Sequence, residues 1–180
     1  MGTWAWYRRL SPEYFCKLQE DPAEAYVYFG LYDEDEASDA EINAYYALMD
    51  GLQDAGRLIN IEKAWLPLYF VLTGDRDWKL HEVPPALANA VLGGTETEWE
   101  AGNGSVRFLM PPEVQATAAA LTDFSEAEMQ ARLTPEAFRA ADFGEWTLGD
   151  FQHIRDAFVR VRQFFADAAR DGDVVLLSLD

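Results

Sequence analysis

The chain has 180 residues, 49% of them hydrophobic and 14% aromatic, which is enough for one folded domain with a sizeable core. Its formal net charge of −18 argues against a nucleic-acid-binding protein and against docking on anionic membranes, because clustered lysine and arginine bind those partners. Such a charge attracts a cationic protein as partner, although solubility alone also explains the acidity.

The N-terminus and the cysteine content bear on the compartment. The sequence MGTWAWYRRL has no signal-peptide pattern, and the longest strongly apolar run, residues 64–72, is about half the length that spans a bilayer. Cys16 is the only cysteine, so the chain forms no internal disulfide and suits a reducing environment. We therefore expect a cytoplasmic protein.

The first predicted elements are a strand and a helix. Residues 3–9 are rich in aromatic side chains and predict a strand. Ser11 and Pro12 suit the N-cap and the first position of a helix, and Glu13 places negative charge in its first turn. A second aromatic segment, residues 23–32, is compatible with either type of element.

A strongly acidic stretch follows. No basic residue lies between Lys17 and Arg57, and the run DEDE at 33–36 repels itself, which predicts a solvated loop. The spacing of Ser38 and Glu41 indicates a capping box at the start of a helix that reaches about residue 54.

Shorter elements are expected in the middle of the chain. Glycine, proline and capping residues predict a helix at 87–92, an extended segment at 105–109, and helices beginning near Pro111, Ser125 and Thr134.

The clearest periodic segment is residues 148–170. Its helically spaced apolar side chains are Phe151, Ile154, Phe158, Val161, Phe165 and Ala168. Gly172 ends this helix, and residues 174–179 predict a buried strand. Helices outnumber strands, and the strands lie mostly near the two chain ends. We therefore expect an α+β fold: one compact, helix-rich domain over residues 1–180 with a small sheet.

No enzyme signature is present. The two histidines, His81 and His153, are too few for a histidine-built metal site, and we interpret each as an ordinary polar residue. The segment GNGS at 102–105 lacks the third glycine of a dinucleotide-binding loop, the lysine of a P-loop and the second glycine of a nucleophile elbow. We expect no metal and no cofactor, assign no catalytic residue, and favour a protein without catalysis.

The stretch INIEKAWLPLYFVLTG, residues 59–74, predicts a buried helix. Trp65, Leu68 and Tyr69 follow helical spacing, and further apolar side chains cover its other faces. Pro67 is incompatible with a helix interior, so the helix either bends there or begins near Trp65. We expect Trp65 to be largely buried.

This stretch, beginning with Ile61-Glu62-Lys63-Ala64-Trp65, resembles the hallmark of the YfbM-like proteins, a bacterial family of unknown function. Other segments agree in the same order along the chain: residues 7–13, 92–94, 102–104, 107–109, 112–114 and 168–172. The resemblance implies a compact cytosolic α+β domain without an established activity or cofactor, and segment 33–56 is its least family-like part. Relatives commonly carry histidine where this chain has Tyr69. If that histidine is catalytic in the relatives, its replacement by Tyr69 puts their activity in doubt for this chain.

Two functions remain open. The first is non-catalytic binding of a cationic protein by the acidic surface between Glu20 and Asp54. The second is a small-anion-binding protein, or an enzyme, with a basic and aromatic pocket around Lys63, Trp65 and Arg107. The full set of ligand-binding candidates is Tyr7, Arg8, Arg9, Lys63, Trp65, Tyr69 and Arg107. The competing explanation is that these cations pair with acidic neighbours and hold the fold.

Overall fold

A five-stranded antiparallel sheet forms the middle of the computed structural model, which describes residues 3–30, 37–77 and 86–180. Its strands are β1 (Ala5–Leu10), β2 (Leu58–Asn60), β3 (Thr95–Ala101), β4 (Gly104–Leu109) and β5 (Val174–Leu179), in the order β2-β1-β5-β4-β3. The two strands nearest the chain ends pair with each other, from Ala5 opposite Leu179 to Leu10 opposite Val174. The helix-rich α+β class is confirmed.

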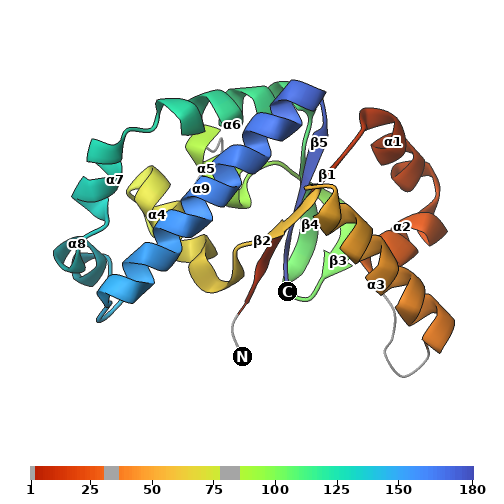
Figure 1. Cartoon of the computed structure of the whole chain (residues 1–180), viewed down its shortest axis with the longest axis horizontal. Coiled ribbons are helices and arrows are strands. Elements are labelled where there is room, and N and C mark those ends of the chain that lie inside the picture. The colour runs from red at the N-terminus through yellow and green to blue at the C-terminus, as the bar shows by residue number, and fades with distance from the viewer. Residues whose placement is uncertain (1–2, 31–36, 78–85) are drawn as a thin grey trace.

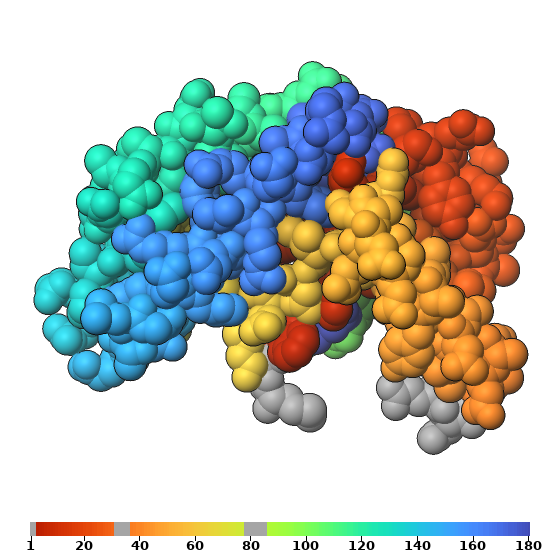
Figure 2. Space-filling view, viewed as in Figure 1, coloured from red at the N-terminus to blue at the C-terminus, as the bar shows by residue number. Residues whose placement is uncertain are grey.

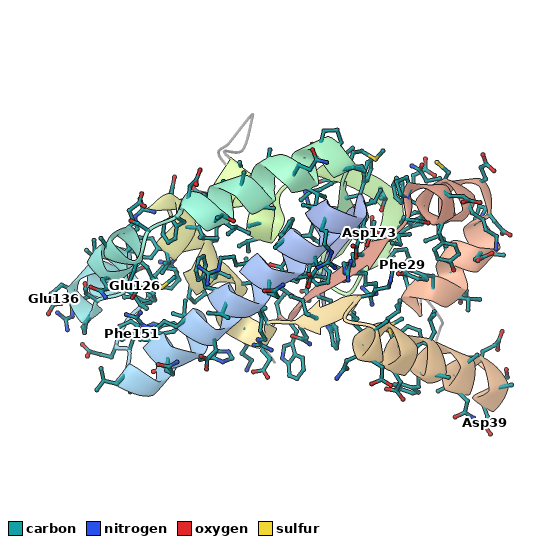
Figure 3. The ribbon with its side chains drawn as sticks, turned by 45° about the horizontal axis from the view of Figure 1, so that its top comes forward. Phe29, Asp39, Glu126, Glu136, Phe151 and Asp173 are labelled. Atoms are coloured by element: carbon teal, nitrogen blue, oxygen red, sulfur yellow. The ribbon has the colours of Figure 1, made fainter. Side chains whose placement is uncertain are left out.

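Helices lie on both sides of the sheet (Figure 1). One group comprises α1 (Pro12–Glu20), α2 (Pro22–Phe29) and α3 (Asp39–Asp54). The other comprises the 3-10 turn η1 (Glu62–Ala64), α4 (Trp65–Thr73), α5 (Ala86–Leu92), α6 (Pro111–Asp123), α7 (Glu126–Arg132), α8 (Pro135–Ala140) and α9 (Leu148–Asp171). Helix α3 projects from the body, with Asp39 at its free end (Figures 2 and 3).

The two helix groups enclose two separate apolar clusters, because successive side chains of a strand point to opposite faces. Tyr7 of β1 belongs to the larger cluster and packs edge-on against Phe164 and Phe165 of α9. Leu10, three residues along the strand, belongs to the smaller cluster with Phe15 of α1.

Local capping signals place the helix ends. The hydroxyls of Ser11, Ser38, Ser125 and Thr134 accept hydrogen bonds from the first turns of α1, α3, α7 and α8. The ambiguous aromatic segment begins as α2, which ends at Gly30 in the left-handed conformation. The acidic run 33–36 and His81 lie outside the described residues.

Two strands were not predicted, β2 and β3. Strand β2 has three residues and shows no alternation. Strand β3, TETEWEA, is an edge strand whose side chains are exposed or half-buried, so it lacks the apolar signal of an interior strand. It is held in the sheet by antiparallel pairing with β4, its partner in a hairpin.

The apolar face predicted for the last helix is confirmed. Phe151, Ile154, Phe158 and Phe165 are all buried, and the helix ends at Gly172 with a φ of 72°. Within the described ranges, no helix combines the length and the apolar character needed to cross a membrane.

Candidate functional site

Four aromatic side chains line a surface hollow beside the start of α4. They are Trp4, Trp65, Phe143 and Trp146, and the hollow has a volume of about 830 Å³. Three chain segments far apart in sequence form it: residues 3–4, residues 62–67 and residues 143–153. In Figure 2 the first two of these, red and yellow, lie side by side at the lower edge of the molecule. We call this the aromatic hollow.

Charged groups line the same hollow: Glu62, Lys63, Asp150 and His153. The Nε2 atom of His153 lies 3.7 Å from a carboxylate oxygen of Glu62. Hydrogen bonds from the side chain and backbone of Thr147 hold the pKa of Asp150 below its usual range, so this carboxylate is ionised at neutral pH. Two carboxylates, one ammonium group and one imidazole therefore line the hollow.

The backbone at Glu62 is strained. Its φ is 51°, a left-handed conformation that a residue with a long side chain seldom adopts. The side chain of Asn60 accepts a hydrogen bond from the Glu62 backbone N–H, which helps to hold this geometry. Strain of this kind is often found at functional sites, where the surrounding structure maintains it.

The turn at Glu62–Ala64 also explains Pro67. Helix α4 begins at Trp65, so Pro67 lies in the first turn, where its missing N–H leaves no intrahelical bond unmade. Of the two alternatives, the helix that begins near Trp65 is therefore confirmed. Trp65 itself is half-buried rather than largely buried, because it packs against the larger cluster while also lining the hollow. Its indole N–H donates to the carbonyl of Thr3 over 3.1 Å.

Replacing Glu62 with glycine should raise the free energy of unfolding by up to about 1 kcal/mol, because glycine adopts this φ without steric strain. The gain is limited by the greater backbone entropy that glycine loses on folding. Chemical denaturation measures the change. The matched control is Asp142→Gly, since Asp142 has a similar φ of 59° but a residue type that tolerates it better. A clear loss of stability in Glu62→Gly would show that the strain is not there.

Arg107 lies in a different cavity from Lys63 and Trp65. It donates to the carbonyls of Gly93 and Gly94 over 3.3 and 3.0 Å, and to Glu96 over 2.6 Å. It thus binds carbonyls that follow α5. The structure does not bring Arg107 into one pocket with Lys63 and Trp65.

Arg8 and Arg9 are buried away from the aromatic hollow. Arg9 donates to Asp171 over 2.6 Å and to Asp173 over 2.9 Å, which ties β1 to the junction of α9 and β5. Arg8 donates to Ser178 over 3.2 Å and lies over the ring of Phe29. The bonds of Arg9 fit the explanation that some of these cations hold the fold.

Tyr7 and Tyr69 are also buried, and neither lines the aromatic hollow. Burial, together with the nearby charge of Asp75, raises the pKa of Tyr69. The hydroxyl therefore stays protonated around neutral pH and does not replace a histidine in proton exchange.

Most of the hollow was not predicted from the sequence. Lys63 and Trp65 were site candidates, whereas Trp4, Phe143, Trp146, Asp150 and the closeness of Glu62 to His153 were not predicted. The available signal was the high tryptophan content, with six in the chain. Spacing along the chain cannot show that residues 4, 65 and 146 meet.

The sequence matches a family model described as "Domain of unknown function (DUF1877)" over residues 1–178. The chain belongs to the DUF1877 family. Its structure is similar to the crystal structure of a protein of unknown function, YfbM from Escherichia coli, with a TM-score of 0.66 and 17% sequence identity over 98% of this chain and 99% of that chain. The YfbM-like resemblance is thereby confirmed, and at this identity the likeness establishes the fold alone. None of the curated proteins compared with the chain matches it.

Proposed function

We propose that this DUF1877-family protein is a cytoplasmic, non-catalytic binding protein whose aromatic hollow receives an arginine side chain of a cationic partner protein. One observation carries the proposal: half-exposed aromatic rings and two carboxylates line the same hollow. Trp4, with 43% of its surface exposed, is the most accessible ring. Aromatic faces attract cations, and tryptophan does so most strongly.

Arginine suits the hollow better than lysine does. Its planar guanidinium stacks on aromatic rings and forms paired hydrogen bonds with a carboxylate, whereas an ammonium group is a compact, strongly hydrated charge. Glu62 and Asp150 are the carboxylates that such a side chain would meet. Lys63, on the same hollow, disfavours a second cation, so we expect one arginine to enter.

The charge of the whole molecule supports the same class of partner. A net charge of −18 steers a cationic protein towards this surface and raises the association rate at low salt. Tryptophan-lined hollows are also frequent anchor points of protein interfaces. Binding of this kind needs no catalytic group. His153 lies 3.7 Å from a carboxylate oxygen of Glu62, beside the group that the guanidinium would meet.

Titration with a short glycine-flanked arginine peptide tests the proposal, and the neutral citrulline counterpart serves as the ligand control. We expect the arginine peptide to shift the backbone amide signals of residues 62–67 and 143–153, and to bind more weakly as salt rises. Trp4→Ala should weaken binding about tenfold, the effect of a lost cation–π contact in a partly desolvated site.

Tyr46→Ala is the matched protein control. Tyr46 is 61% exposed and lies on α3, away from the residues that line the hollow, so its loss should leave binding unchanged. Equal binding of arginine and citrulline, or unchanged binding in Trp4→Ala, would contradict the proposal.

A further inference from the structure

A second cavity lies between α5 and the sheet, on the face that the larger apolar cluster occupies. Its lining includes Tyr7, Leu92, Ser105, Arg107, Leu177 and Leu179. The volume is about 110 Å³, several times the space that one water molecule needs. This cavity shares no lining residue with the aromatic hollow.

The hydroxyl of Tyr7 is buried without a hydrogen-bond partner among the described residues, and the residue itself is 0% exposed. Leaving a buried hydroxyl unpaired costs roughly 1–3 kcal/mol, so a native structure normally supplies an acceptor. Burial raises the pKa of Tyr7, which keeps the hydroxyl protonated and able to donate.

Arg107 lies two strands away in the same row. The register places Tyr7 opposite Leu177 and Leu177 opposite Arg107, so the three side chains extend from the same face of the sheet. Arg107 donates three hydrogen bonds, one each from Nε, Nη1 and Nη2. A guanidinium has five such donors, which leaves two for a ligand.

Apolar side chains complete the lining. Leu92 of α5, with Leu177 and Leu179 of β5, offers contact to a hydrocarbon chain. The cavity thus combines unpaired donors with an aliphatic wall. Glu96 belongs to the same lining, but its side chain is 64% exposed, so it can turn to solvent if another anion approaches Arg107.

We propose that this cavity is a binding site for a small monocarboxylate with a short hydrocarbon chain. The carboxylate accepts hydrogen bonds from the Tyr7 hydroxyl and from the free N–H groups of Arg107, and the chain packs against Leu92, Leu177 and Leu179. This site is independent of the partner proposed for the aromatic hollow.

Butyrate is the probe, and butyramide, of nearly equal shape but without charge, is the ligand control. Titration followed by backbone amide NMR should give saturable shifts at residues 91–92, 105–107 and 177–179 for butyrate, and weaker ones for butyramide. Tyr7→Phe should reduce butyrate affinity by about tenfold or more, the effect of losing one hydrogen bond to a charged group.

Tyr28→Phe is the matched control variant. Tyr28 also has a buried hydroxyl without a partner, but it belongs to the smaller apolar cluster on the other face of the sheet. Its loss should leave butyrate binding unchanged. Equal weakening in both variants would overturn the proposal, as would equal binding of the two ligands or an absence of butyrate binding at millimolar concentrations.

A stability measurement separates this role from a structural one. Without ligand, Tyr7→Phe should unfold at the same temperature as the parent protein or higher, because the change removes an unpaired polar atom and keeps the ring. Butyrate should raise the midpoint of the parent and leave that of Tyr7→Phe unchanged. A variant that is destabilised but binds butyrate normally would assign the hydroxyl to the fold and overturn the proposal.

Discussion

Replacing Phe158 with alanine should lower the free energy of unfolding by roughly 3–5 kcal/mol, a large part of the stability of a typical domain. Phe158 is 4% exposed, and its ring lies 5.8 Å from that of Phe124, which directly follows α6. The loss has two parts: the transfer free energy of the ring, and the cavity that a closely packed interior cannot fill. Chemical denaturation followed by circular dichroism measures it.

The neighbouring residue provides the control. Val159 lies on the same helix but is 52% exposed, so Val159→Ala should change the free energy of unfolding by less than about 0.5 kcal/mol. A comparable loss in both variants would mean that helix propensity, rather than burial of this face, determines the stability of α9. An unchanged midpoint in Phe158→Ala would contradict the assigned face outright.

Features encoded over a few residues were predictable from the sequence. The capping box at Ser38 and Glu41 and the apolar stripe of α9 depend on backbone geometry within one or a few turns, and both are present in the structure. Strand β3 was not predictable in the same way, because its glutamates and threonines form a strand only through pairing with β4.

The candidate site was predictable only in part. Lys63 and Trp65 stand in one local motif, and the structure keeps both on the aromatic hollow. Arg107 is a cation like Lys63, but it donates to carbonyls that follow α5. Spacing along the chain does not show which acceptor a cation will bind. Trp4 precedes β1 and Trp146 precedes α9, and both line the hollow. This arrangement depends on long-range packing, which cannot be read from the sequence.

Replacing Arg9 with methionine should lower the free energy of unfolding by roughly 3–5 kcal/mol, because it leaves a buried carboxylate without its main partner. The side chain of Asp173 is 4% exposed, and Figure 3 places it near the middle of the molecule. After the change, Arg57 still lies near Asp173, with its Nη1 atom 3.7 Å from the carboxylate. The control is Arg170→Met, since Arg170 is 65% exposed and its ion pairs should contribute at most about 1 kcal/mol.

The same substitution should also change how stability depends on pH below neutrality. Hydrogen bonds from Arg170 and Arg9 lower the pKa of Asp171 to about 2, from a usual value of 3.8. Because the folded-state pKa is the lower one, this stabilisation is present above about pH 4 and is lost as pH falls towards 2. Arg9→Met removes one of the two donors, so its deficit relative to the parent protein should shrink over that interval. Denaturation midpoints of both proteins between pH 5 and pH 2 measure the difference, and a deficit that grows on acidification would refute the role of Arg9 in holding this carboxylate ionised.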